Sequence, residues 1–140
     1  MLDTVRVVLV GDHTAWAPGA QALEDDVSGG KALVVARTDD PAKAGALVRR
    51  HRPDVVVVDD RLAIVRELSG GPARVLVLSR QVDAESALAA LRAGAAGFLP
   101  ATAEPMALVP SLLAVASGLA VLPAGILAVL AGTQVSRHRG

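Results

Sequence analysis

Three side chains that could do chemistry stand at the ends of runs of β-branched and apolar residues. Asp59 directly follows Val55–Val58, Ser79 directly follows Val75–Leu78, and Asp12 follows a similar run near the N-terminus after one glycine. A short apolar run bounded by polar residues is typical of a strand that is buried on both faces. The three side chains are therefore predicted at the carboxyl ends of parallel strands, which is the edge where open α/β sheets bind ligands.

The chemistry of this group is that of carboxylates near a hydroxyl. Asp12 and Asp59 could together hold Mg²⁺ weakly, with water completing the coordination. Asp60 could supply a further carboxylate, although its side chain is predicted on the opposite face if the strand continues. The three histidines are scattered and indicate neither a metal site nor an acid–base pair. We expect no metal site, no cofactor beyond weak Mg²⁺, no catalytic residue and no enzymatic activity.

Composition limits the class of protein. A chain of 140 residues, 52% of them hydrophobic, is long enough for one domain with a core. The 14 basic and 14 acidic residues balance, so no direct contact with nucleic acid is indicated. The chain contains no cysteine, which excludes disulfides and thiolate metal sites. The N-terminus lacks the pattern of a signal peptide, so we expect a cytoplasmic protein.

Strand and helix patterns alternate along the chain, which predicts an α/β fold with a parallel sheet covered on both faces. The third helix is short because Ser69–Pro72 is a strong stop signal. We assign residues 1–119 to a domain, and residues 120–140 to a helical extension with a frayed tail. The predicted strands are 5–10, 32–36, 55–58, 75–78 and 97–99. The predicted helices are one carrying Ala20 to Leu23, then 41–51, 63–68, 84–93, 105–117 and 123–130.

Four segments of the chain stand out as a set, in a fixed order: Val8–His13, Arg52–Asp59, Val75–Ser79 and Ala90–Leu99. Together they resemble the receiver domains of response regulators, most closely the NarL/FixJ type that is normally followed by a LuxR-type helix-turn-helix. This resemblance implies a flavodoxin-like (CheY-like), doubly wound, five-stranded parallel sheet of order 2-1-3-4-5.

In that family, acidic residues and a phosphoacceptor aspartate hold Mg²⁺, and a lysine after the fifth strand stabilises the phosphorylated product. The resemblance makes Asp59 the equivalent of the phosphoacceptor and Asp12 the second of two acids. Asp60 is the other carboxylate of this degenerate acidic pocket. Ser79 and Phe98 match the hydroxyl and aromatic switch positions.

The sequence departs from the family pattern around this pocket. Gly11 replaces the first acid, and Ala101 falls where the lysine should be. The connection after Asp59 is about two helical turns shorter than usual, and Pro18 disturbs the opposite wall. We therefore expect a phosphorylation-independent pseudo-receiver of an atypical transcriptional regulator. The alternative is a functional receiver that is phosphorylated on Asp59 in a two-component phosphorelay.

Partners follow from the same pattern. No charged residue and no histidine occurs between Pro105 and Ser136, so the fifth helix has almost no polar face. Because large exposed apolar patches mark interfaces, we expect a homodimer. Membrane insertion is the rival, but proline and glycine interrupt the run. The resemblance also implies a LuxR-type DNA-binding domain in the full-length protein, and the degenerate pocket could take a small-molecule or protein ligand. The predicted interface residues are Leu108, Leu112, Leu113 and Val115.

Overall fold

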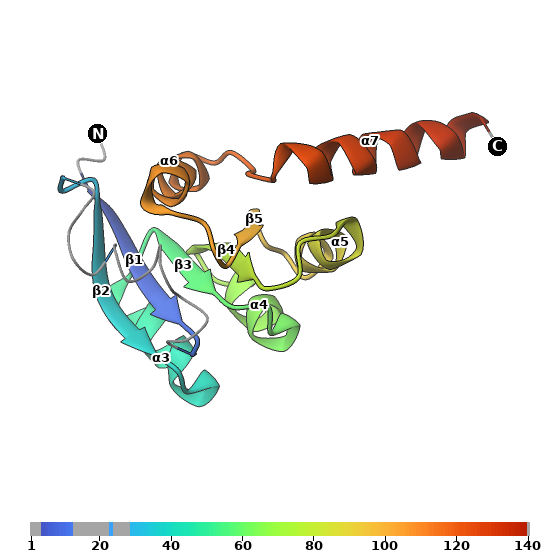
Figure 1. The fold of residues 1–140 in the computed structure, drawn as a ribbon. Helices are drawn as coiled ribbons and strands as arrows, with labels where there is room; N and C mark the ends of the chain where they lie inside the picture. The colour runs from blue at the N-terminus through green and yellow to red at the C-terminus, as the bar shows by residue number, and fades with distance from the viewer. Residues whose placement is uncertain (1–3, 13–22, 24–28, 140) are drawn as a thin grey trace.

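A computed structural model describes residues 4–12, 23 and 29–139, with the backbone alone for residues 133–139. Five parallel strands form one sheet in the order β2-β1-β3-β4-β5, which confirms the predicted order and fold class (Figure 1). The strands are β1 (Val5–Val10), β2 (Ala32–Thr38), β3 (Val55–Val58), β4 (Arg74–Ser79) and β5 (Gly97–Pro100).

The helices cover both faces of the sheet. Buried residues of α3, α4 and α5 form one core layer with one side of the strands, and those of α6 form a second layer with the other side. Leu23 is buried in the α6 layer, whereas the rest of the helix predicted around it lies outside the described residues, as do Trp16 and Pro18. The helices are α3 (Pro41–His51), α4 (Leu62–Ser69), α5 (Ala84–Arg92), α6 (Pro105–Ala116) and α7 (Ala124–Arg139).

The valine run of β3 shows why the sheet has two cores. All four residues are fully buried, and their side chains alternate between the two layers because successive residues of a strand point to opposite faces. Val56 and Val58 pack with α3 and α4, whereas Val55 and Val57 pack in the layer of α6. The central strand therefore holds its carboxyl end, and Asp59 after it, in a fixed position.

Two aspartates cap helices. Asp40 accepts a hydrogen bond from the backbone N–H of Ala42, and Pro41 occupies the first helical position of α3. Asp83 accepts one from the backbone N–H of Ser86 at 2.7 Å, and this bond lowers the pKa of the Asp83 carboxyl group. The carboxylate of Asp83 is thus stabilised in its ionised form at the start of α5.

The segment after α6 covers the outer edge of β5. The N–H of Phe98 donates to the carbonyl of Val121 at 2.9 Å, and the N–H of Val121 donates to the carbonyl of Ala96 at 3.1 Å. Gly97 permits this close packing, because a Cβ on it would lie 2.5 Å from Cδ1 of Leu76. The edge of the sheet is therefore paired rather than open.

Helix α7 is longer than predicted, since it continues to Arg139 rather than ending near Leu130. Its residue Ile126 is buried in the core layer of α3, α4 and α5, and Leu122 and Leu130 pack against the same layer. The rest of the helix extends past α5 (Figure 1). Within the part of the chain that the structure describes, no helix is both long enough and apolar enough to cross a membrane.

The predicted interface on α6 needs correction. Leu108, Leu112 and Val115 are completely buried between α6 and the sheet, so they cannot form a surface of the folded chain. Leu113 is only partly buried, and Met106 on the same helix is 90% exposed. The prediction failed because α6 is apolar on all sides, so sequence periodicity did not separate its inward from its outward positions.

Candidate functional site

Asp59 lies at the carboxyl edge of the sheet, directly after β3. Its backbone N–H donates to the carbonyl of Val10 at 3.3 Å, which ties it to the end of β1. The residue is only 8% exposed. A nearly buried carboxylate at this position needs a compensating charge or hydrogen bonds, because an isolated buried charge is costly.

Arg61 supplies that compensating charge. Its Nε donates to both carboxylate oxygens of Asp59, at 2.8 Å to Oδ1 and 3.0 Å to Oδ2. The backbone N–H of Arg61 also donates to Oδ1 of Asp59 at 3.3 Å, which closes an Asx turn over residues 59–61. The cation that faces Asp59 therefore comes from the chain itself.

The guanidinium group of Arg61 is partly enclosed at the site. Its Nη2 atom is buried and has no hydrogen-bond partner among the described residues, while the side chain as a whole is 38% exposed. Sequence analysis missed Arg61. The available signal was a basic residue two positions after a strand-end aspartate, where a turn brings the side chain back to the carboxylate.

Asp60 and Ser79 meet in a different arrangement, between the ends of β3 and β4. Ser79 Oγ donates to the carbonyl of Gln81 at 2.8 Å and accepts from the N–H of Gln81 at 3.1 Å. Asp60 Oδ2 lies 3.4 Å from Ser79 Oγ and accepts from the N–H of Arg80 at 3.3 Å. Both side chains thus brace the loop after β4, and Asp60 does not share the partner of Asp59.

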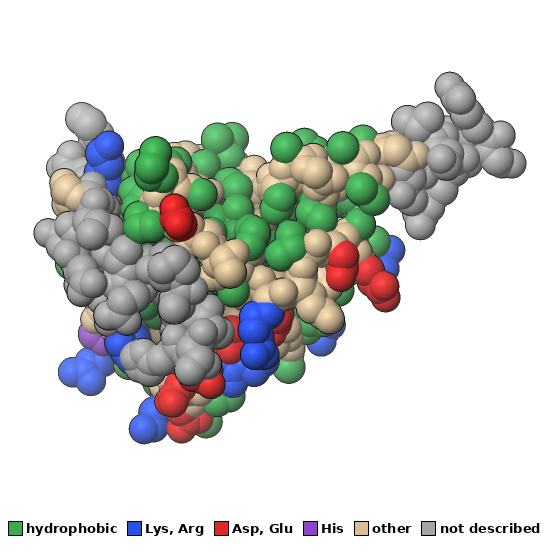
Figure 2. Space-filling view, in the orientation of Figure 1, with side chains coloured by type: hydrophobic (Ala, Val, Ile, Leu, Met, Phe, Trp, Pro, Cys, Tyr) green, Lys and Arg blue, Asp and Glu red, His purple; other side chains and the backbone are tan. Residues whose placement is uncertain are grey.

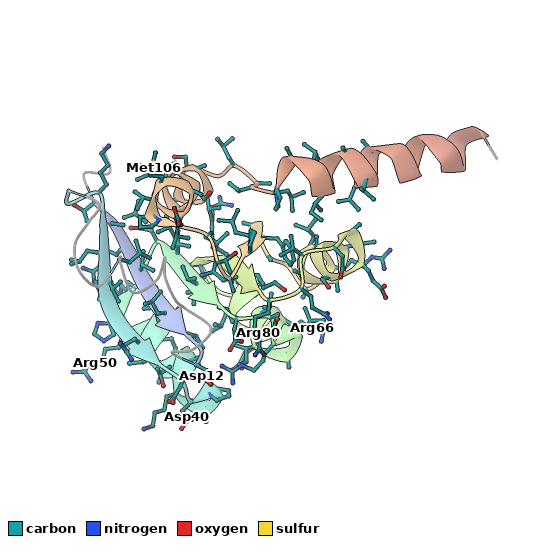
Figure 3. All side chains as sticks on the ribbon, viewed as in Figure 1. Asp12, Asp40, Arg50, Arg66, Arg80 and Met106 are labelled. Atoms are coloured by element: carbon teal, nitrogen blue, oxygen red, sulfur yellow. The ribbon has the colours of Figure 1, made fainter. Side chains whose placement is uncertain are left out.

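The two substituted pocket positions provide neither a carboxylate nor a cation. Gly11 donates its N–H to the carbonyl of Thr38 at 2.9 Å, which continues the pairing of β1 with β2. Ala101 is buried, and its N–H donates to the carbonyl of Ser79 at 2.7 Å. Asp12 is exposed at the same edge, as Figure 3 shows. Among the described residues no group of three or more metal-ligating side chains is present.

A cleft of about 950 Å³ opens between α4 and α5, beside this edge. Asp60, Ser79 and Asp83 line it, while Asp59 does not. Phe98 contributes to its lining but is almost fully buried in the core layer of α3, α4 and α5. The predicted site residues therefore separate into an Asp59–Arg61 pair and an Asp60–Ser79 group at the cleft.

The chain is similar both to curated protein sequences and to solved structures. The chain is 34% identical over 140 residues to a probable transcriptional regulatory protein NarL of Mycobacterium tuberculosis (strain ATCC 25618 / H37Rv). This match covers 93% of the chain but 63% of the relative, so the chain spans less than two thirds of the length of that curated relative. No family model matches the chain.

Two solved structures are similar along nearly their whole length. One is the signal receiver domain of the putative response regulator NarL from Mycobacterium tuberculosis, with 30% identity, a TM-score of 0.72, and coverage of 83% of this chain and 98% of that one. The other is a two-component response regulator of the LuxR family from Aurantimonas sp. SI85-9A1. It has 28% identity, a TM-score of 0.80, and coverage of 94% of this chain and 99% of that one.

Proposed function

Because the chain belongs to the receiver domains of NarL/LuxR-type response regulators, we propose that it is a pseudo-receiver whose regulatory state does not depend on phosphorylation of Asp59. The observation that carries this proposal is the ion pair between Asp59 and Arg61. In this reading the chain is a regulatory module and not an enzyme.

Two features of the site oppose phosphorylation. A carboxylate that attacks a phosphoryl group needs an available oxygen, yet Arg61 binds both oxygens of Asp59. A phosphorylated aspartate would also need cations to balance the added charge. Gly11 supplies no carboxylate for a metal, and buried Ala101 supplies no cation for the phosphoryl oxygens.

Incubation with Mg²⁺ and acetyl phosphate, followed by intact mass measurement, tests the proposal. We expect no phosphoryl adduct on the natural chain. The matched variant carries Gly11→Asp and Ala101→Lys, which restore the family's residue types at these two positions, and Arg61→Ala, which frees Asp59; it should gain an adduct that Asp59→Asn removes. A stable adduct on the natural chain that is lost in Asp59→Asn would instead favour the alternative of a phosphorylated receiver in a phosphorelay.

The longer relatives suggest the setting in which such a module works. Since the curated NarL relatives extend well beyond the matched region, we propose that the full-length protein carries a LuxR-type DNA-binding domain and acts as a cytoplasmic transcription regulator. Helix α7 would then be the connection to that domain. The receiver-like part would set how two DNA-binding domains are presented to paired half-sites.

We further propose that the module is a homodimer that forms without a phosphodonor. Figure 2 shows apolar side chains gathered over α6 and α7, while charged side chains lie mainly over the opposite part of the molecule. We call this surface the apolar ridge. Its most exposed apolar residues are Met106, which is 90% exposed, and Leu119, which is 61% exposed. A contiguous apolar surface of this kind favours association, and two-fold dimers are the commonest assemblies.

Sedimentation at micromolar concentration tests the dimer. A double variant with Met106→Glu and Leu119→Glu should shift the dimer to a monomer, because it places charges on the apolar ridge. Leu33→Glu is the matched control, since Leu33 is 52% exposed on β2 away from the ridge. A natural chain that is monomeric throughout would refute the dimer, and a dimer that resists the double variant would assign it to another face.

A further inference from the structure

A second cavity, of about 540 Å³, lies at the opposite edge of the sheet, where strands β3 and β4 begin. We propose that it binds a small organic anion with a carboxylate or phosphate head group and an apolar body. Its charged lining residues are Arg49, Arg52, Arg74 and Asp54, and its apolar lining residues are Val48, Pro53, Pro72, Ala73 and Ala116.

The charges around this cavity are unbalanced. Arg49 and Arg52 come from the end of α3 and Arg74 from the start of β4, and their guanidinium groups have no ion pair or hydrogen bond with any described residue. Asp54 is already engaged, because its Oδ2 accepts from the backbone N–H of Arg6 at 2.9 Å. The lining therefore carries three guanidinium groups and one carboxylate. Nη1 of Arg49 and a carboxylate oxygen of Glu67 in α4 lie near the same point beside Gly45, but they form no ion pair.

Arg52 is held at the cavity in an unusual backbone conformation. Its φ of 48° lies in the left-handed region, and among the described residues it is alone in this apart from glycines. Arg52 closes α3 by donating its N–H to the carbonyl of Val48 at 2.9 Å, a position where glycine is the common residue. The chain thus has an arginine where glycine would be easier, and its side chain lines the cavity.

The lining fits an anion with an apolar part better than a bare inorganic ion. The planar fork of a guanidinium group matches the oxygens of a carboxylate or a phosphate. Val48, Pro53 and Ala73 are buried, so they form an apolar floor beneath the arginines. A volume of about 540 Å³ is in the usual range for small-molecule sites.

The cavity also adjoins the segment that leads to α7. Ala116, the last residue of α6, is part of its lining. Nη2 of Arg74 lies 3.6 Å from the place that a Cβ on Gly118 would take, and Gly118 begins the connection to Val121. A bound anion would therefore contact the start of the path toward a following domain, and its binding does not depend on the state of Asp59.

Titration of ¹⁵N-labelled protein with 1-naphthyl phosphate and 1-naphthoate tests the site. We expect saturable shifts in the backbone amides of Arg52, Ala73 and Gly118. The neutral probe 1-naphthamide should bind at least about tenfold more weakly, since hydrogen bonds to charged groups are the stronger ones. Equal binding of the neutral probe, or no saturable binding of either anion, would overturn the proposal.

Variants separate the site from a general attraction of anions to the surface. Arg49→Gln with Arg74→Gln should weaken binding by about tenfold or more, because two charged partners are lost. The control pair Arg66→Gln with Arg92→Gln removes two exposed arginines outside the cavity and should leave affinity unchanged. Arg52→Gly keeps the backbone conformation and should also weaken binding. Unchanged affinity in the Arg49 and Arg74 pair would refute the site.

Discussion

The carboxyl edge and the amino edge of the sheet, where the strands end and begin, differ in how their charged side chains are paired. At the carboxyl edge, Asp59 is paired with Arg61 from the same turn, and Asp60 is bonded to the loop after β4. At the amino edge, three arginines line a cavity without a partner among the described residues. Asp59 at the carboxyl edge is thus already paired with a cation of the chain, whereas the arginines of the other edge would be available to the proposed anion.

Under the proposed function, this difference would explain how a receiver fold is kept without control by phosphorylation. The strands that hold Asp59 in place are the same valine-rich strands that build both cores, so the fold does not depend on the chemistry of the pocket. An internal arginine can then replace the cations that a metal and a lysine would bring. A regulatory signal would then have to act at a site other than Asp59, and the proposed anion site in the amino-edge cavity is one such site.

The largest effect should come from breaking the Asp59–Arg61 pair. Arg61→Ala leaves a nearly buried carboxylate without its partner, and should lower the free energy of unfolding by about 1–3 kcal/mol. Urea denaturation measures this loss. The control Arg80→Ala, at an exposed position of the same edge, should change stability by less than about 0.5 kcal/mol.

A second substitution sharpens the same test. Adding Asp59→Asn to Arg61→Ala should recover part of the lost stability, because the unpaired charge is then removed. If the double variant is no more stable than Arg61→Ala alone, the loss arises from packing of the Arg61 side chain and not from its charge.

At the amino edge, the expected change has the opposite sign. Arg52→Gly relieves a left-handed arginine, and should raise the free energy of unfolding by up to about 1 kcal/mol after the greater freedom of glycine in the unfolded chain is counted. Arg50→Gly, at an exposed position in the last turn of α3, should instead lower it by about 0.5–1 kcal/mol. Thermal unfolding of both variants decides this, and a destabilised Arg52→Gly would show that the arginine serves folding.

The smallest effect should be on how the free energy of unfolding depends on pH in acid. The hydrogen bond from Ser86 lowers the pKa of Asp83 in the folded chain below its unfolded value. Its contribution to stability is therefore present above the unfolded pKa and is lost as the pH falls through the folded pKa. Asp83→Asn should flatten the acid limb of the unfolding free energy plotted against pH. Identical acid limbs in the natural chain and Asp83→Asn would contradict this.

Much of the fold could be predicted from residue patterns. Runs such as Val55–Val58 predict the strands, and an aspartate at position 39 or 40 followed by Pro41 predicts the start of α3, since these signals are local. The length of α7 and the pairing of Val121 with β5 were missed because they depend on contacts between distant segments.

The site was only partly predictable for the same reason. Asp59, Asp60 and Ser79 could be placed at one edge because each follows a strand. Which of them would share a partner depends on turn geometry, so the binding of Asp59 to Arg61 was not foreseen. The cluster of Arg49, Arg52 and Arg74 is invisible in the sequence, because it forms only when α3 and β4 meet at the sheet.

The most direct test of the central claim is to observe Arg61 itself while the site is challenged. The Nε–H resonance of Arg61 in ¹⁵N-labelled protein can be followed during titration with Mg²⁺ and the phosphoryl mimic beryllofluoride. If Arg61 holds Asp59 in place of a metal and a phosphoryl group, this resonance should remain unchanged at low millimolar Mg²⁺ and beryllofluoride. Saturable movement of the resonance, together with the backbone amides of Asp59 and Ser79, would show that the pair opens and that Asp59 still accepts a phosphoryl group.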